Sequence, residues 1–314
     1  MSRETSSCEP SRAPQSSKPG TDETISGKSA RGFPAPAGLS IVSTPIGNAG
    51  DITLRALDAL RRVSAVACED TRVTMKLFAL HGIATKLIAY HDHNAEHVRP
   101  KLLEKLKSGE ALALVSDAGT PLISDPGYKL VRACLDAGIA VTGMPGPAAL
   151  IDALVLAGMP TDRFFFAGFL PARKAGRRAA IAELKAVPGS LVFYESPRRL
   201  ADCLADLAAG LGDRPAAVAR ELTKRFEELR RDLLPALAAH YAKADTPKGE
   251  VAIVVGPPDK KAAATAEETA DLDALLTGAM ARLSLRDAVA NVTAATGLKR
   301  RDVYQRALTL GRGK

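Results

Sequence analysis

The feature that most constrains the fold is a short apolar run followed by a long, stiff loop. Residues Ala111–Val115 are apolar and too few for an isolated helix, so they predict a buried strand. The loop that follows, up to Gly127, contains two Pro and two Gly residues, which fix its path and allow a ligand to come close. Tyr128–Leu135 then has helical spacing, and Gly138 ends it. Open α/β sheets bind ligands at such strand-end loops, although an ordinary strand–helix connection has the same pattern.

The same alternation of apolar runs and helical segments continues along the chain. It predicts an α/β fold with a mostly parallel sheet covered on both faces, and strand-end loops along one rim. A helix is expected over residues 95–107, and Thr53 is expected to cap the helix after the first strand. The other strands expected in the first unit are Leu39–Ser43, Ser64–Cys68, Leu87–Tyr90 and Ile139–Thr142. The strands expected in a second α/β unit are Arg163–Gly168, Ser190–Tyr194, Ala216–Ala219 and Glu250–Val255.

Changes in composition predict the domain organisation. Residues 1–37 are rich in Ser, Thr, Pro and Gly and have almost no bulky apolar side chains, so we expect a disordered tail. The two α/β domains are expected over residues 38–160 and 161–257. Residues 258–270, rich in Ala, Lys and Glu, are expected to form a linker.

The C-terminal segment, residues 271–314, is expected to form short helices beginning near residues 271, 284 and 299. It carries eight basic and four acidic side chains, which is half of the chain's formal net charge of +8. A helix, a Gly turn at Gly297 and then a basic helix is the order found in helix-turn-helix modules. The segment therefore indicates a polyanionic partner, with a merely solvated basic helix as the alternative.

Composition also argues against several classes of protein. No apolar run approaches the roughly 20 residues of a membrane span, and the polar first residues do not resemble a secretory signal. The four Cys residues are far apart and no CxxC pair occurs, so neither a disulfide framework nor a zinc site is expected. His91, Asp92, His93 and His97 have poor spacing for metal ligands, and no metal is predicted. We expect a cytoplasmic protein without a membrane partner.

Several loop motifs together carry a resemblance to a known family. They are STPIGN at Ser43–Asn48, CEDTR at Cys68–Arg72, VSDAGTP at Val115–Pro121, SDPG at Ser124–Gly127, PGPAA at Pro145–Ala149 and FYESPRR at Phe193–Arg199. In this order they closely resemble the tetrapyrrole methylase (class III methyltransferase) superfamily and, within it, the ribosomal RNA small subunit methyltransferase I family. The resemblance covers residues 39–256 nearly continuously, and the C-terminal helices resemble that family's appended helix-turn-helix segment.

The resemblance implies a fold, a cofactor and an activity. It implies two α/β domains with S-adenosylmethionine in the cleft between them, usually in a homodimer. It also implies methyl transfer to the ribose 2′-oxygen of a cytidine in the decoding region of 16S rRNA, in the 30S ribosomal subunit. Tetrapyrrole-modifying relatives carry a Gly-x-Gly-Pro-Gly-Asp first loop, whereas this chain has Thr44–Asp51, TPIGNAGD, so the RNA branch is favoured.

The chain has no P-loop and no G-x-G-x-x-G fingerprint, which agrees with a cofactor held by Gly- and Pro-rich loops without many charges. Carboxylates near a sulfonium stabilise the bound cofactor more than the transition state, so we assign Asp117 to binding rather than chemistry. The residues expected to bind the cofactor are Pro45, Gly47, Asp117, Ala118, Gly119, Thr120, Pro121, Ser124, Asp125, Pro147, Ala148, Phe193 and Tyr194.

A ribose hydroxyl needs proton removal or strong hydrogen bonding to become a nucleophile. Glu69, Asp70 and Glu195 follow expected strands and are the candidate proton acceptors, with a structural ion pair or helix cap as the alternative for each. The side chains expected to contact RNA are Arg72, Arg198, Arg199, Lys224, Lys299, Arg300 and Arg301.

Two other functions fit part of the pattern. A tetrapyrrole (precorrin-type) methyltransferase would share the cofactor cleft but would not need a basic C-terminal segment. A non-enzymatic nucleic-acid-binding regulator would use the α/β domains as a ligand sensor and the C-terminal helices for binding.

Overall fold

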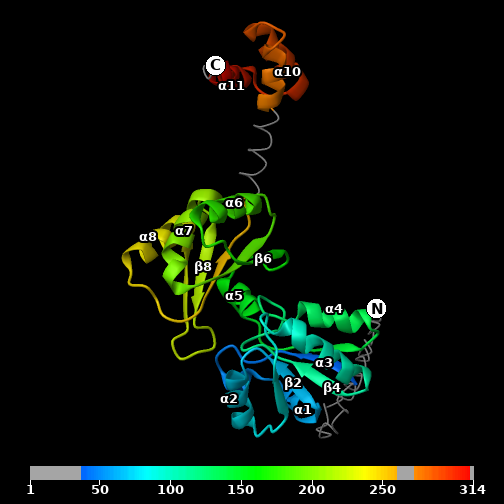
Figure 1. Ribbon diagram of the computed structural model, residues 1–314. Coiled ribbons are helices and arrows are strands. Elements are labelled where there is room, and N and C mark those ends of the chain that lie inside the picture. Colours follow the sequence, from blue (N-terminus) through cyan, green and yellow to red (C-terminus); the bar gives the residue numbers. More distant parts are fainter. Residues whose placement is uncertain (1–36, 260–271, 312–314) are drawn as a thin grey trace, which may run out of the picture.

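The computed structural model describes residues 37–259 and 272–311, which form two five-stranded sheets and a C-terminal group of helices (Figure 1). The expected tail over residues 1–37 and the expected linker over residues 258–270 lie almost entirely outside the described residues. None of the described helices is long and apolar enough to cross a membrane.

The first sheet is entirely parallel, with strand order β3-β2-β4-β1-β5. It confirms the fold class expected from the alternating pattern. Thr53 caps α1 by accepting a hydrogen bond from the Ala56 amide, 3.1 Å away, as predicted. The elements of this unit are β1 (Gly38–Val42), η1 (Ala49–Asp51), α1 (Leu54–Arg62), β2 (Ala65–Cys68), α2 (Thr71–His81), β3 (Lys86–Ala89), α3 (Ala95–Lys107), β4 (Ala111–Leu114), α4 (Tyr128–Asp136) and β5 (Val141–Met144).

Helices cover both faces of this sheet because successive side chains of a strand point to opposite sides. On β4, Leu112 and Leu114 pack with residues of α3 and α4. Ala113 packs on the other face with residues of α1 and α2. A strand buried on both faces reads as a continuous apolar run, which is why β4 was recognisable from the sequence.

The second sheet has the order β6-β7-β10-β8-β9 and is mixed, since only β6 and β7 are parallel. One face packs against α6, α7 and α8, and the other against α5, which joins the two units in the chain (Figure 1). Its elements, with the linking helix, are α5 (Ala149–Ala157), β6 (Phe164–Phe169), α6 (Lys174–Leu184), β7 (Ser190–Glu195), η2 (Pro197–Arg199), α7 (Leu200–Leu211), β8 (Pro215–Arg220), β9 (Glu228–Leu233), α8 (Leu234–Lys243) and β10 (Val251–Val255).

Two strand assignments differ from the sequence prediction. The strand expected at Ile139–Thr142 is β5 at Val141–Met144, two residues later. Strand β9 was not predicted at all. It is the edge strand beside β8, and most of its residues are exposed, so its charged sequence, ELRRDL, has no apolar face to reveal it.

The C-terminal helices cover residues 272–280, α10 (Leu285–Thr296) and α11 (Arg300–Gly311), close to the predicted starting points. They share a small apolar core that includes Leu276, Val292 and Val303. The Arg306 guanidinium donates two hydrogen bonds of 2.6 Å to the Asp273 carboxylate and ties α11 to the first of these helices.

Candidate active site

Four loops meet at the carboxyl edge of the first sheet. Thr44, after β1, and Gly119, after β4, exchange backbone hydrogen bonds of 2.9 and 3.0 Å. The Asp70 amide, after β2, donates to the Asp117 carboxylate at 3.0 Å. The Thr120 hydroxyl donates to the Pro147 carbonyl, after β5, at 3.0 Å. Hydrogen bonds therefore connect the strand-end loops that the sequence predicted along this rim.

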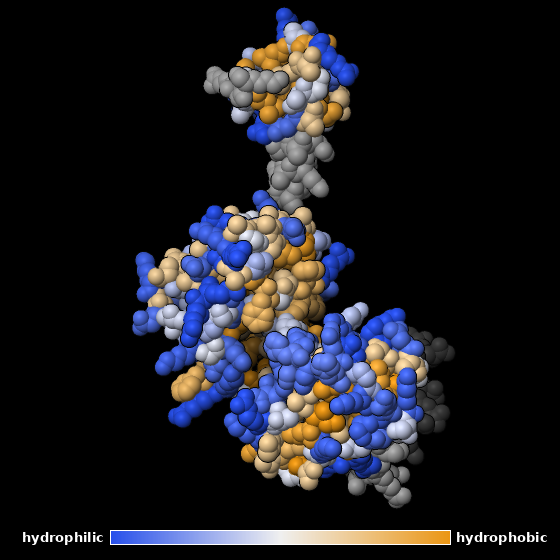
Figure 2. Space-filling model, in the orientation of Figure 1, coloured by the Kyte–Doolittle hydropathy of each residue, from blue (hydrophilic) through white to orange (hydrophobic). Residues whose placement is uncertain are grey.

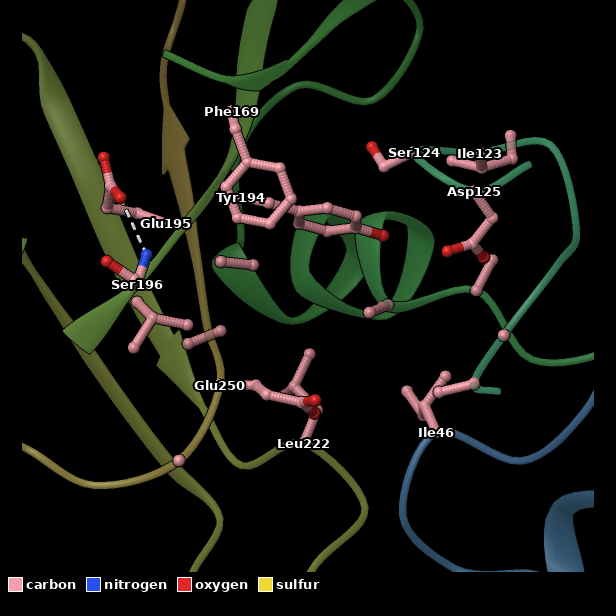
Figure 3. A pocket seen from close by; sticks show the side chains of 18 of the residues that line it. Ile46, Ile123, Ser124, Asp125, Phe169, Tyr194, Glu195, Ser196, Leu222 and Glu250 are labelled. Carbon is pink, nitrogen blue, oxygen red and sulfur yellow. Dashed lines mark hydrogen bonds between the residues drawn. The ribbon is translucent and has the colours of Figure 1, made fainter. Parts of the chain in front are cut away.

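A cavity of about 460 Å³ lies between this rim and the second sheet (Figures 2 and 3). Its volume falls in the range of roughly 300–1,000 Å³ that is usual for small-molecule sites. Predicted cofactor residues that line it are Asp117, Ala118, Gly119, Thr120, Ser124, Asp125, Ala148 and Tyr194. The remaining lining residues are Ile46, Ile123, Ala149, Phe169, Glu195, Ser196, Pro197, Ala219, Leu222, Gly249, Glu250, Val251 and Ala252.

An aromatic wall bounds the cavity on the side of the second sheet. Phe166 and Phe169 pack edge-on against Tyr194, with ring centroids 4.9 and 5.7 Å away. The Tyr194 hydroxyl accepts a hydrogen bond of 3.0 Å from the Leu150 amide at the start of α5. Figure 3 shows the same hydroxyl directed toward Asp125 across the cavity. Burial raises the pKa of Tyr194, and the charge of Asp125 adds to the effect.

The loop between β4 and α4 forms the opposite wall in a strained conformation. Leu122 and Ser124 adopt positive φ angles of 73° and 64° without being glycine. Such residues each cost about 1–3 kcal/mol and persist where the surrounding contacts fix them, commonly at functional sites. Ser124 and its neighbour Asp125 both line the cavity, so the strain is located at the site itself.

Two carboxylates of the cavity, those of Asp117 and Asp125, form no ion pair with a described residue. The pKa of Asp125 is raised to about 6, mainly by burial and then by the negative charge of Glu69, while a hydrogen bond with Ser116 offsets part of the rise. No Lys, Arg or His is found among the described residues that line the cavity. Most side chains of the pocket are apolar, and its unpaired carboxylates give it a local excess of negative charge.

Comparison with known proteins identifies the family. Residues 38–238 match the family described as Tetrapyrrole (Corrin/Porphyrin) Methylases, and residues 266–311 match the RsmI C-terminal HTH domain. The chain is 50% identical over 278 residues to Ribosomal RNA small subunit methyltransferase I of Mesorhizobium japonicum, covering 88% of this chain and 93% of that one. The chain belongs to the ribosomal RNA small subunit methyltransferase I family. The Escherichia coli O157:H7 protein of the same name is 47% identical, covering 86% of this chain and 94% of its own length.

Solved structures support the fold. Diphthine synthase aligns with a TM-score of 0.55 at 18% identity, covering 69% of this chain and 89% of its own. Cobalt precorrin-4 methyltransferase aligns with a TM-score of 0.53 at 16% identity, and the alignment covers 69% of this chain and 94% of that one. These neighbours establish the two-domain tetrapyrrole methylase fold for this methyltransferase, as the loop motifs implied.

Five predicted cofactor residues lie outside the lining of the cavity. The Phe193 side chain is fully buried on the face of the second sheet that packs against α6–α8, because its position on β7 alternates with that of Tyr194. Pro147 contributes its carbonyl to Thr120 rather than a surface to the cavity. The other three residues are Pro45, Gly47 and Pro121.

The lining residues Gly249–Ala252 were missed because β10 is antiparallel to its neighbours. Leu222, which follows the carboxyl end of β8, was also missed. Val251 pairs with both Glu195 of β7 and Arg220 of β8. The amino end of β10 therefore reaches the same edge as the carboxyl ends of the other two strands. A search for strand-end loops looks only at carboxyl ends, so the residues just before β10 gave no signal.

The two predicted proton acceptors of the first unit lie beside the cavity and do not line it. Asp70 caps α2, accepting from the Arg72 amide at 2.8 Å, and forms an ion pair of 2.6 Å with the Arg72 side chain. These hydrogen bonds lower the pKa of Asp70 to about 2, which makes it a weak base. Glu69 has a raised pKa, first because of burial and then because of the charges of Asp117 and Asp92.

The third predicted proton acceptor, Glu195, lines the cavity, but other groups already bind its carboxylate. One oxygen accepts from the Ser196 amide at 2.7 Å, and the other pairs with Arg199 at 3.0 Å. Arg199 also donates to the Leu170 carbonyl at 2.6 Å. The structure therefore shows the ion pair that was the alternative for Glu195.

The predicted RNA-binding cations divide into two groups. Arg72, Arg199 and Lys224 pair with carboxylates; Lys224 lies 2.8 Å from both Glu221 and Glu250. The others are exposed, with no ion pair to a described residue: Arg198 before α7, and Lys299, Arg300 and Arg301 at the start of α11. No group of three metal-ligating side chains occurs in the described part of the chain.

Proposed function

We propose that this methyltransferase transfers the methyl group of S-adenosylmethionine to the ribose 2′-oxygen of a cytidine in 16S rRNA of the small ribosomal subunit. The observation that carries the proposal is the pair of carboxylates, Asp117 and Asp125, that face the cavity without a cationic partner among the described residues. A partly desolvated negative charge favours a ligand that is positively charged. S-adenosylmethionine has a sulfonium and an amino group, whereas a phosphate-rich cofactor would be repelled.

The shape of the cavity also suits such a cofactor. Gly119 lines it with a φ of +82°, and an added Cβ would lie 3.3 Å from Ile46 and 3.7 Å from the Pro147 carbonyl oxygen. The backbone of this loop can therefore approach a ligand more closely than a larger residue would allow. Tyr194 and Phe169 offer aromatic surface for a nucleoside, and the Asp117 carboxylate offers polar contacts.

Bound S-adenosylmethionine supplies a methyl group already activated by the sulfonium, so the protein mainly aligns the attacking oxygen with it. Alignment contributes roughly 7–11 kcal/mol to lowering a barrier of this kind. Our candidate for the acceptor of the hydroxyl proton is Asp125. It lines the cavity, and with a pKa of about 6 it is mostly ionised at neutral pH and more basic than an ordinary Asp.

The relatives and the C-terminal helices support an RNA substrate. Relatives at 47–50% identity are named ribosomal RNA small subunit methyltransferases, and the exposed cations at the start of α11 suit a polyanion. Incubation with labelled S-adenosylmethionine, 30S particles and a precorrin separates the candidate functions. Label in 16S rRNA supports the proposal. Label in the tetrapyrrole, or in neither substrate, refutes it.

We also propose a homodimer. The edge strand β6 exposes Phe164 and Phe165, and α5 exposes Val155, at 42, 45 and 64% of their surfaces. Large apolar side chains left exposed on an edge strand are typical of a protein interface. Light scattering after size-exclusion chromatography should give twice the chain mass of 32.9 kDa. A mass of one chain at micromolar concentration would exclude the dimer.

A further inference from the structure

The turn between β8 and β9, residues 221–227, presents an aromatic side chain to solvent. Phe226 keeps 67% of its surface exposed. The Arg225 guanidinium lies 5.6 Å from the centroid of its ring, within cation–π distance. Exposing a ring of this size gains nothing for the folding of the chain, because its apolar surface stays in water.

The exposure of Phe226 is not the result of a loose turn. The Thr223 amide donates to the Glu227 carboxylate at 2.7 Å, and the Lys224 amide donates to the Glu221 carbonyl at 3.0 Å. Glu221 and Thr223 both have positive φ angles, 52° and 64°, which persist only where the surroundings determine them. The backbone of the turn that carries the ring is thus fixed before any partner arrives.

The same turn lies at the border of the cavity and contacts the first unit. Leu222 lines the cavity, and so does Glu250, whose carboxylate binds Lys224 at 2.8 Å. The Thr223 hydroxyl accepts a hydrogen bond of 3.2 Å from the Asn48 amide in the loop after β1. The Lys224 stem packs so closely on Gly47 that an added Cβ there would collide with it. The turn that carries Phe226 therefore borders the cavity beside the loop after β1.

We propose that Phe226, together with Arg225, is a stacking platform for an unpaired base next to the nucleotide that is methylated. The inference rests on the proposed function, because it requires an RNA substrate. A 2′-hydroxyl can enter the cavity only from an unpaired or distorted segment, whose neighbouring bases then lose their stacking partners. An exposed ring replaces that stacking for any base. Arg225, which forms no ion pair with a described residue, adds a cation for the flanking phosphate.

The test compares 30S binding and methylation by the full chain and its Phe226→Ala and Phe226→Tyr variants. Stacking on one side chain changes affinity by about 5- to 150-fold. Phe226→Ala should weaken 30S binding and raise KM for 30S by a factor in that range, while S-adenosylmethionine affinity stays unchanged. Phe226→Tyr should restore binding to within about threefold, because the π surface remains. Leu80→Ala is the matched control, since Leu80 is 71% exposed near the C-terminal end of α2.

Salt dependence separates the two members of the platform. Arg225→Ala should lower the magnitude of the slope of log affinity against log salt concentration by about 1, the change expected for losing one phosphate contact. Phe226→Ala should leave this slope unchanged. Equal 30S affinity of Phe226→Ala and parent overturns the inference while leaving the proposed function intact. A change of oligomeric state in Phe226→Ala also overturns it, because the ring then contacts a second copy of the chain. Failure of the parent to methylate 30S refutes both.

Discussion

Replacing Gly119 with Val tests whether the loop after β4 shapes the cofactor site. Gly119 has a φ of +82°, a conformation that costs an L-residue about 1–2 kcal/mol. Domains are stable by about 5–15 kcal/mol, so the variant should still fold. The free loop relieves this strain by leaving its native conformation, and a ligand that needs the native conformation must restore it. Affinity for S-adenosylmethionine should then fall about 5- to 30-fold from backbone strain alone.

The added side chain increases the loss. A Cβ at this position would lie 3.3 Å from Ile46, which also lines the cavity, and Val branches at that atom. Gly138 offers a matched control, because its φ is +68° and no atom lies within 4 Å of a Cβ placed there. Gly138→Val should lose similar stability in a urea titration and keep the parent's affinity in calorimetry. Unchanged affinity in a folded Gly119→Val variant would refute the assignment of this loop to the cofactor.

Three further predictions concern the proton acceptor, the core and the C-terminal helices. Asp125→Asn should lower the single-turnover rate at saturating cofactor about 100- to 10,000-fold. In the parent the single-turnover rate should fall about tenfold per pH unit below the Asp125 pKa of about 6, because only the ionised carboxylate accepts the proton. A parent rate that does not change between pH 5 and 7 would contradict this. The buried Arg177 guanidinium lies 2.7 Å from the Asp206 carboxylate, and Asp206→Ala would leave it without that partner. The free energy of unfolding measured in urea should then fall by about 3–5 kcal/mol. The matched control Asp136→Ala, which breaks an exposed ion pair, should lower it by less than about 1 kcal/mol. Deletion from Asp271 onward should preserve cofactor affinity and weaken 30S binding with a smaller salt slope, whereas equal slopes would show the segment to be a solvated appendage.

Elements with local signals were predictable from the sequence. Helix α3 covers the predicted residues 95–107, Thr53 caps α1, and α2 ends at His81 before Gly82, which has a φ of +60°. Each of these depends on residues a few positions apart. Strand β9 lacks such a signal, because an exposed edge strand needs no apolar face.

The candidate site was only partly predictable because it depends on contacts between distant segments. The loop at 117–125 follows a recognisable strand, and most of its predicted residues line the cavity. The raised pKa of Asp125 depends on burial and on Glu69, which only the fold brings near. Similarly, the Glu195–Arg199 pair and the antiparallel direction of β10 cannot be read from strand-end motifs. Side-chain chemistry was visible in the sequence, but the partner of each side chain was not.

The most direct test of the central claim is nucleoside mass spectrometry of 16S rRNA from 30S particles methylated by the purified parent chain. The account predicts one added methyl group per particle, on the ribose of a cytidine, with the adjacent phosphodiester now resistant to alkaline cleavage. The same particles incubated with the Asp125→Asn variant should remain unmethylated over the same time. A methyl group on a base instead of a ribose, or none on the RNA while cofactor binds normally, would contradict the account.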